Sequence, residues 1–310
     1  MEPLDRAANA YLVKVEGVTF LVDGGVQRPP EDALRAPYAL LTHWHWDHVL
    51  GLARANYRGV ICASQRTIDY LSGTMPRFEG SAAVMRAFGD VPQEIRPILE
   101  LSLSRVKEVV SYVKGGGRVT PFDECEPVQT GIVKVVACPG HSDDHVCYLV
   151  EDHAFVGDLV NPDAGLSVLD LEDYVASLLG LLSYGTWAVA HPGHGRDVDR
   201  AYVASWAVES ISGKLRRVVR LASMLSRDWR PLASYLEVLY PSDSPFIRWI
   251  GARSLLGYAL TLEKMGLAEL NTEGQPWTIR AREGADGRSQ ARPAGSRQGR
   301  EDATPDRDEA

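Results

Sequence analysis

The chain has 310 residues, of which 45% are hydrophobic and 24% are charged, and its formal net charge is -8. This length is sufficient for one large domain with a sizeable core and a smaller second unit. The longest apolar runs, such as 38–41 and 133–138, are far shorter than the roughly 20 residues of a membrane-spanning helix, so no transmembrane segment is expected.

The N-terminus and the cysteines give a first indication of the compartment. The opening MEPLDRAANAYLV has acidic residues where a secretory signal has a basic and then an apolar run, which predicts a cytoplasmic protein. The cysteines, Cys62, Cys125, Cys138 and Cys147, are widely separated and form no CxxC pair. Neither a disulfide framework nor a thiolate zinc site is indicated, and buried free thiols are expected.

The first third of the chain predicts strands followed by a helical stretch. Strands are expected at 11–15 and 18–22, joined by a short Glu16-Gly17 hairpin connection. The apolar run 38–42 is typical of a buried strand whose carboxyl end supports a site. Residues 65–122 form a largely helical insertion, which could be a lid, a dimer contact or a substrate wall.

Later segments return to strands and then to helices. Strands are expected at 132–138, 146–150, 154–156 and 187–190, with a helix near 171–183. Beyond residue 199 the pattern predicts helices at 202–226, 232–239 and 248–265, followed by a short strand-like piece. This order resembles a winged-helix-like module over residues 199–272. Residues 273–310 are rich in Arg, Gly, Asp, Ala and Pro and are assigned to a disordered tail, with disorder expected from about residue 280 onward.

The stretch THWHWDH at 42–48 concentrates three imidazoles and a carboxylate in seven positions. In an extended segment His43 and His45 point to the same side while Trp44 faces away. A tight turn is then expected to redirect Asp47 and His48 to a neighbouring position. The pattern favours half of a two-metal site that needs further ligands from later loops.

Three later loops offer such ligands. They are Cys138-Pro-Gly-His141-Ser, Phe155-Val-Gly-Asp158-Leu and His191-Pro-Gly-His194-Gly. Each follows an apolar run, so the loops are expected to gather at one edge of a sheet.

These motifs resemble the metallo-beta-lactamase superfamily of hydrolases. HWHWDH at 43–48, PGHSDDH at 139–145, GD at 157–158 and PGHG at 192–195 occur in the family's order. The opening NAYLVKVEGVTFLVDGG is similar to that fold's first hairpin. The resemblance covers about residues 9–198 and implies an α/β fold, a four-layer αββα sandwich, with residues 1–198 as the catalytic domain.

The same resemblance implies a set of ligands. A first zinc ion would be held by His43, His45 and His141, a second by Asp47, His48 and His194, and Asp158 would bridge them. Two ions about 3.5–4 Å apart can share a hydroxide, lower its pKa towards ~7 and polarise a carbonyl or phosphoryl oxygen. Asp47 is also the candidate catalytic residue, passing a proton to the leaving group. Iron or manganese would suit these ligands as well.

The remaining histidines near the motifs are expected to have supporting roles. His191 is assigned a structural role, His145 a role in supporting the ligands or in packing, and His153 a place in an exposed turn. Asp23, after the second strand, is expected to support the ligand loops by hydrogen bonds. Trp44 is expected either to contact substrate or to pack against the sheet edge.

Charge is unevenly distributed, which bears on possible partners. Residues 1–199 carry 16 Lys and Arg against 27 Asp and Glu, whereas residues 200–270 carry 10 against 6. The basic part includes a set that recurs at helical spacing and would form a cationic stripe for phosphate backbones: Lys214, Arg216, Arg217 and Arg220. Arg248 and Arg253 lie later in the same module. The alternative is a solvated helix face that pairs with the acidic body.

The superfamily spans lactams, thioesters, phosphodiesters and redox chemistry, so the substrate stays open. PGHSDDH, PGHG and a basic helical module containing LEKMGLAEL are most similar to the lactamase-beta-like branch that includes a single-strand-specific endoribonuclease. The leading prediction is therefore a dinuclear zinc hydrolase that uses a metal-bridged hydroxide, with two candidate substrates. One is single-stranded RNA, as for an endonuclease, and the alternative is a small-molecule thioester, as in glyoxalase-II-like chemistry. A third hypothesis is a noncatalytic protein that binds nucleic acid. The sequence is also compatible with a homodimer.

Overall fold

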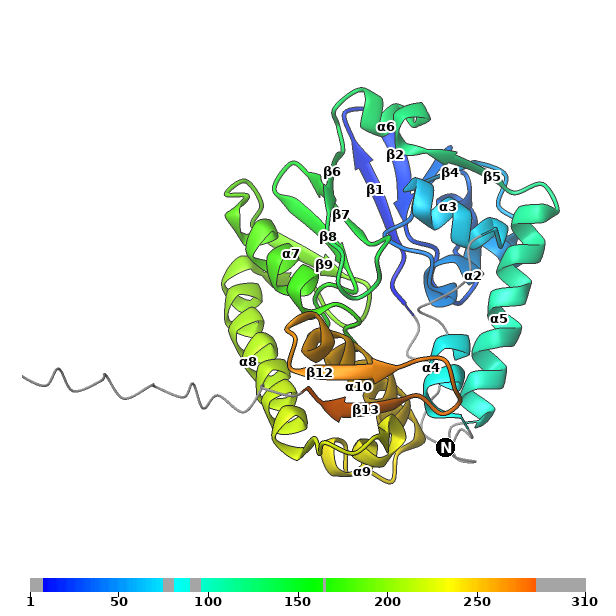
Figure 1. The fold of residues 1–310 in the computed structure, drawn as a ribbon. Helices are drawn as coiled ribbons and strands as arrows, with labels where there is room; N and C mark the ends of the chain where they lie inside the picture. The colour runs from blue at the N-terminus through cyan, green and yellow to red at the C-terminus, as the bar shows by residue number, and fades with distance from the viewer. Residues whose placement is uncertain (1–7, 75–80, 90–95, 164–165, 283–310) are drawn as a thin grey trace, which may run out of the picture.

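The computed structural model describes residues 8–74, 81–89, 96–163 and 166–282. Two five-stranded sheets pack face to face, and helices cover the outer face of each (Figure 1). The predicted α/β fold class, a four-layer αββα sandwich, is confirmed.

The first sheet has the strand order β1-β2-β3-β4-β5. Its strands are Tyr11–Val15, Val18–Val22, Tyr38–Leu40, Val60–Ala63 and Arg118–Pro121. β1 and β2 are antiparallel, and the remaining neighbours are parallel. The predicted hairpin is confirmed: Glu16 and Gly17 both adopt a positive φ, as a tight two-residue connection requires. β5 lies in the stretch that was predicted to be helical.

The second sheet has the order β10-β9-β8-β7-β6. In chain order from β6 its strands are Lys134–Ala137, Val146–Val150, His153–Gly157, Val189–Pro192 and Val198–Asp199. Only β8 and β9 run parallel among these pairs. Four of the five strands were predicted within a few residues, and the two-residue β10 was not.

Strand β2 shows how one strand serves two layers. Phe20 and Val22 face the core between the sheets, where they meet Tyr148 and Phe155, whereas Leu21 faces the helices on the outside. Successive side chains of a strand point to opposite faces, so a strand buried on both faces is apolar throughout.

Helices cover both outer faces. α2 (Trp46–Ala55), α3 (Gln65–Ser72) and α5 (Arg96–Lys114) cover the first sheet, and α7 (Leu171–Ser183) and α8 (Arg200–Met224) cover the second. The shorter elements are α1 (Glu31–Leu34), α4 (Ser81–Phe88), η1 (Phe122–Glu124) and α6 (Glu126–Gln129).

The insertion contacts the C-terminal part of the chain. The backbone N–H of Trp277 donates to the carbonyl of Ala87 at 2.9 Å. Phe88 of α4 and Leu99 of α5 share a hydrophobic core with Leu255. The insertion therefore forms a wall that joins the first sheet to the C-terminal helices.

The C-terminal unit combines helices with a small sheet. After α8 come β11 (Arg230–Pro231), η2 (Leu232–Tyr235), α9 (Leu236–Leu239), α10 (Pro245–Lys264), β12 (Ala268–Asn271) and β13 (Thr278–Ala281). The three strands form an antiparallel sheet in the order β11-β13-β12.

The predicted start of the tail at residue 273 is wrong. Trp277 and Ile279 are 4% and 0% exposed and anchor β13 in the core, so the ordered chain continues through residue 282. Burial of these two side chains and pairing of β13 with β11 and β12 hold a segment whose composition is otherwise polar. The disorder predicted further along falls on 283–310, which lies outside the described residues.

The prediction of free thiols is also wrong. All four cysteines are paired, Cys62 with Cys125 and Cys138 with Cys147, at Cα–Cα distances of 6.0 and 5.9 Å. The first pair is separated by 63 residues in sequence, and it forms because Cys125 follows η1 beside β4. The spacing of the cysteines along the chain does not predict this contact.

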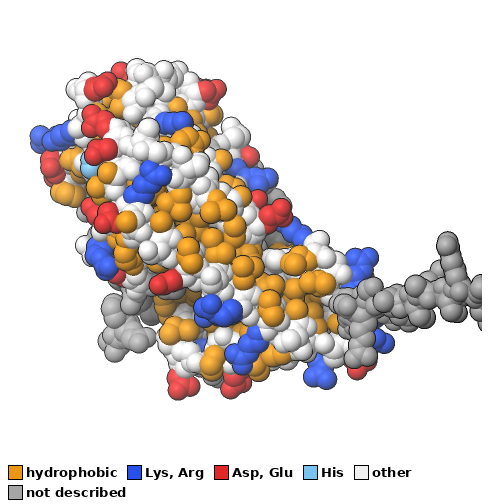
Figure 2. Space-filling model, turned by 90° about the vertical axis from the view of Figure 1, so that its left-hand side faces the viewer, with side chains coloured by type: hydrophobic (Ala, Val, Ile, Leu, Met, Phe, Trp, Pro, Cys, Tyr) orange, Lys and Arg blue, Asp and Glu red, His pale blue; other side chains and the backbone are white. Residues whose placement is uncertain are grey.

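The predicted cationic stripe is broken by Lys214. Its side chain is buried, its Nζ donates to the carbonyl of Leu166 at 2.9 Å, and it lies 5.3 Å from the ring centre of Tyr174. Arg216, Arg217 and Arg220 are exposed, and the same helix also exposes three large apolar side chains: Val208, Leu215 and Val219. Figure 2 shows apolar side chains gathered over this side of the molecule.

None of the described helices is both long and apolar enough to cross a membrane.

Burial of Lys214 makes stability depend on pH. Burial lowers the pKa of Lys214 to about 7, against 10.5 in the unfolded chain. Between these pH values the unfolded chain binds more protons, so the free energy of unfolding rises with pH. We expect the free energy of unfolding of Lys214→Met to lack this pH-dependent increase. Between pH 7 and pH 9.5, urea unfolding should show wild type gaining on the order of 3 kcal/mol relative to the variant. A difference that stays constant with pH would show that Lys214 titrates normally.

Candidate metal centre

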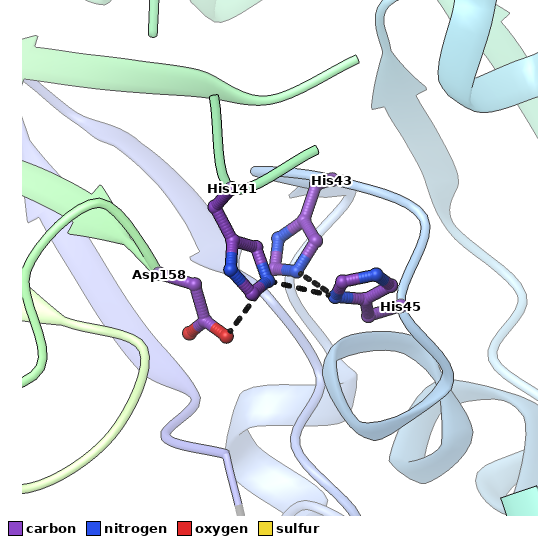
Figure 3. A group of neighbouring side chains, drawn as sticks. All are labelled: His43, His45, His141 and Asp158. Carbon is purple, nitrogen blue, oxygen red and sulfur yellow. Dashed lines mark hydrogen bonds and ion pairs between the residues drawn. The ribbon is translucent and has the colours of Figure 1, made fainter. Parts of the chain in front are cut away.

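The seven residues predicted as ligands meet in two adjacent clusters. One contains His43, His45, His141 and Asp158, and the other contains Asp47, His48 and His194. Within each cluster the candidate ligand atoms all lie within 4.8 Å of one another. Figure 3 shows the first cluster, in which side chains from three separate segments point toward a common centre.

The first motif spans the end of β3 and the start of α2. His43 and His45 lie in the connecting segment, and α2 begins at Trp46. We expected a tight turn here; a helix begins instead, and its first turn carries Asp47 and His48 to the second cluster. Trp44 is 4% exposed and stacks on Tyr70 with ring centres 5.1 Å apart. The contacts of Trp44 are therefore packing contacts.

Hydrogen bonds at the outer ring nitrogens set the tautomers of two histidines. His141 Nδ1 lies 2.9 Å from the carbonyl of Ser167, which can only accept, so Nδ1 carries the proton. His43 Nδ1 lies 3.0 Å from Thr42 Oγ1, whose own proton goes to Asp23. Both rings therefore turn an unprotonated Nε2 into the cluster, at 2.8 Å and 3.0 Å from Nδ1 of His45.

Asp23 supports both clusters, as expected from its place after β2. Its carboxylate accepts from the backbone N–H and the hydroxyl of Thr42, both at 2.8 Å. It also lies 2.8 Å from Nδ1 of His48. Asp23 adopts a φ of 56°, a left-handed conformation that aspartate tolerates better than most residues. One buried carboxylate thus fixes the strand end and orients His48.

Asp158 lies between the two clusters. Its Oδ2 is 3.3 Å from Nε2 of His141, and its Oδ1 is 3.3 Å from Nε2 of His48 and 3.5 Å from Nε2 of His194. The close approach depends on Gly193, where a Cβ would lie 2.5 Å from Oδ1. One oxygen faces each cluster, as a bridging ligand would require.

The second cluster is more open to solvent. His194 Nε2 lies 3.3 Å from Oδ2 of Asp47, and their side chains are 13% and 21% exposed. Asp158 is 9% exposed on the same scale. Asp47 is therefore the carboxylate of the centre that solvent reaches most easily.

A further layer of hydrogen bonds holds the first motif in place. Asp144, buried beneath it, accepts from the backbone N–H of Trp44 at 2.8 Å and from the hydroxyls of Thr67 and Ser142, each at 2.7 Å. Burial raises the pKa of Asp144 to about 6. The loop with the two histidines is thus tied to α3 and to the PGHSDDH loop.

The other histidines take supporting places. His145 Nε2 accepts from the backbone N–H of Asp158 at 3.0 Å, so it positions that carboxylate. His191 stacks on Phe155 and lies 3.0 Å from Asp197, consistent with a structural role. His153 is not in a turn; it begins β8 and lies 2.8 Å from His191.

The electrostatics favour neutral imidazoles and ionised carboxylates in the first cluster. Burial holds the pKa of His43 and of His45 well below the usual value and lowers that of His141 to about 4. Burial opposes ionisation of Asp158, but the charges of His194 and His48 outweigh it and hold its pKa well below normal. These are the protonation states in which both side chains bind cations.

In the second cluster the electrostatics favour the protonated form of His48. Burial alone would lower the pKa of His48, but Asp23 and Asp158 raise it well above the usual value. Hydrogen bonding and the charges of His48 and His194 lower the pKa of Asp47, again against burial. A positive charge is thus favoured between these carboxylates.

The donor set fits divalent cations. His48 Nε2 and Asp158 Oδ1 are buried and 3.3 Å apart, and among the described residues neither makes a well-directed hydrogen bond. Imidazole and carboxylate ligands suit zinc, iron and manganese, so the donors define the class of ion without selecting one.

Arg253 was not predicted as part of this centre. It lies on α10, and its Nη2 is 3.3 Å from Nε2 of His45. The two residues are 208 positions apart, and the sequence predicted Arg253 only as a basic residue on a helix of the C-terminal module.

Comparison with known sequences agrees with the geometry. The family model for the metallo-beta-lactamase superfamily matches residues 4–194. The chain belongs to this superfamily. Metallo-beta-lactamase folds among solved structures align over most of its length. A Thermus thermophilus family member has a TM-score of 0.65 and 19% identity, covering 90% of this chain and 95% of its own. A Burkholderia ambifaria beta-lactamase domain protein has a TM-score of 0.62 and 16% identity, covering 88% and 87%.

Two curated relatives carry different names. The atrochrysone carboxyl ACP thioesterase of Aspergillus fumigatus is 27% identical over 206 residues, covering 63% of this chain and 52% of the relative. The beta-lactamase-like protein 2 homolog of Caenorhabditis elegans is 25% identical over 275 residues, covering 84% and 79%. The chain thus spans about half the length of the thioesterase that it matches.

Asp23 offers a test of the support beneath both clusters. Asp23→Asn keeps the shape and tolerates the left-handed backbone, but its amide cannot accept all three hydrogen bonds. We expect zinc affinity to fall by about 10- to 100-fold, measured by competition with a chromophoric chelator. Asp32→Asn, at an exposed carboxylate on α1, is the matched control. Equal affinities in both variants would remove Asp23 from the support of the centre.

Proposed function

We propose that the chain is a dinuclear metal-dependent hydrolase, with zinc as the leading ion, and that it cleaves a thioester. The main support for this proposal is the position of the Asp158 carboxylate, which directs one oxygen toward each of the two candidate ligand clusters. Relatives named as thioesterases support the choice of substrate. A chain that only binds nucleic acid would have no use for two such clusters.

The residues around the clusters suit hydrolysis without a protein nucleophile. A pair of bound divalent ions would activate water and polarise the scissile carbonyl. Asp47 is ionised and accessible, so it can accept a proton released near the clusters and pass it to the departing sulfur. His194, 3.3 Å from Asp47, holds this carboxylate in place.

Single-stranded RNA is the second candidate substrate. The element order α8, β11, α9, α10, β12, β13 is typical of a winged-helix-like module and favours this reading. The electrostatic support is weaker than the sequence indicates, because Lys214 is buried and Arg217 lies over the ring of Tyr240. Val208 and Leu215 occupy exposed positions on the same helix. Thioester cleavage is therefore the better supported function.

The first test compares substrates and metal states. The purified protein should hydrolyse an acyl thioester of N-acetylcysteamine, lose activity on chelation and regain it with zinc. His48→Ala should reduce turnover by more than the about 10- to 100-fold expected for an outer partner of a metal ligand. His153→Ala, a partly exposed histidine at the start of β8, is the control. Cleavage of single-stranded RNA without thioester turnover would overturn the proposal in favour of the second candidate.

Asp47 has a separate test. Asp47→Asn removes the proton acceptor, and turnover should fall by about 100-fold or more, as for loss of a general acid or base. Elemental analysis should establish whether both ions remain, so that loss of a ligand is distinguished from loss of proton transfer. Full turnover with both metals retained would eliminate Asp47 as the catalytic residue.

A further inference from the structure

The outer side of α8 carries a line of exposed apolar residues. One face of the helix is buried in the core, as expected for a helix that covers a sheet. On another face, Val208, Leu215 and Val219 are 66%, 48% and 67% exposed. Leu179 of α7, the helix beside it, is 58% exposed (Figure 1). Contiguous apolar residues on the outside of a covering helix are typical of an interaction surface.

The spacing of these residues suits a pair of helices. Val208, Leu215 and Val219 are seven and four residues apart, so they lie along one line of the helix, which Ala204 extends toward its N-terminus. We call these four residues the outer face of α8. Two copies of α8 can pack antiparallel with the midpoint between positions 211 and 212. Val208 then lies opposite Leu215 of the second copy, and Ala204 lies opposite Val219, so that a small side chain meets a large one at each end.

The charges beside the outer face have the same symmetry. Glu209 and Arg216 are exposed and lie seven residues apart on one flank of it. They are about 10 Å apart along the helix, too far for an ion pair within it, and neither forms an ion pair with another of the described residues. In the antiparallel arrangement each Glu209 lies opposite Arg216 of the second copy, and two-fold symmetry makes this contact twice. A parallel pair would place glutamate against glutamate, so the charge pattern favours the antiparallel pair.

Other occupants suit the outer face less well. Residues 283–310 contain no Val, Leu, Ile, Met, Phe, Tyr or Trp, so they offer no large apolar side chain to cover it. A nucleic acid binds mainly through its phosphate backbone, which gains nothing from an apolar line. A second copy of the chain supplies both the apolar residues and the opposite charges.

We propose that the chain forms a two-fold symmetric homodimer through antiparallel packing of its α8 helices. The same residues of both copies form the interface, so it is self-complementary and closes after two chains. This inference does not depend on the reaction that the metal centre catalyses.

Sedimentation equilibrium of the full chain is the first test. Wild type should have twice the mass of one chain at micromolar concentration. Leu215→Glu places two unpaired carboxylates in the contact and should raise the dimer Kd by about 100-fold or more, with an unchanged circular dichroism spectrum. Met85→Glu, at an exposed residue of α4 on the opposite side of the molecule, is the control and should remain a dimer (Figure 1). A monomeric wild type would overturn the proposal, and so would a dimer that Met85→Glu dissociates and Leu215→Glu does not.

A charge exchange tests how the two helices are aligned. Glu209→Arg places two arginines together at each of the two contacts, and Arg216→Glu places two glutamates together, so each variant should raise the dimer Kd by about 10-fold. The double variant restores opposite charges and should recover the wild-type Kd. A double variant that dissociates more readily than either single one would refute the antiparallel pairing.

An introduced thiol reports the orientation directly. All four native cysteines are paired, so an added one is the only free thiol. Ser212→Cys lies beside the midpoint and should form a disulfide with its own copy under mild oxidation. Ser223→Cys, on the same side of α8, would be roughly 30 Å from its copy and should form none. Cross-linking of both variants would indicate a parallel pair, and cross-linking of neither would exclude contact between the α8 helices; either result overturns the proposal.

Discussion

The buried carboxylate of Asp158 sets the constraint on which the centre depends. A buried charge is tolerated only where opposite charge and hydrogen bonds surround it. Here the compensation comes mainly from His48 and His194, whose Nε2 atoms lie 3.3 and 3.5 Å from Oδ1 and whose charges lower the pKa of Asp158. His141 lies 3.3 Å from Oδ2 with an unprotonated Nε2. The backbone of Asp158 is held by His145. The two clusters therefore share one carboxylate, and the four loops must meet at the same edge of the sheets for it to be stable there.

The sandwich brings these loops together through its strand ends. β3 ends before His43, β8 ends before Asp158, and β9 ends before His194, so three of the motifs leave their strands at one edge. Close backbone approach completes the arrangement. At Gly157 a Cβ would lie 2.6 Å from His145, and at Gly193 it would lie 2.5 Å from Asp158. Glycine is required at both positions because the ligand loops fill the space that a side chain would occupy.

The features that could be predicted from the sequence are those that a local residue pattern encodes. The hairpin at 11–22, the strand 146–150 and the helix 171–183 agree with the structure. The seven candidate ligands, which the structure brings together, were predicted from motifs that each lie within a few residues. The errors concern contacts between distant segments: the pairing of Cys62 with Cys125, the burial of Lys214, and β13, whose strand partners supply its stability. Arg253 is of the same kind, since only the fold brings α10 to His45.

The boundary predicted near residue 198 does not divide the site. Lys214 of α8 donates to the carbonyl of Leu166, and the next carbonyl, that of Ser167, accepts from His141. α10 packs at Gly257 against the residues that follow. The segment that orients a candidate ligand is thus held from two sides by C-terminal helices. A unit that the sequence suggests as an appended nucleic-acid-binding module is, by its contacts, a structural part of the metal centre.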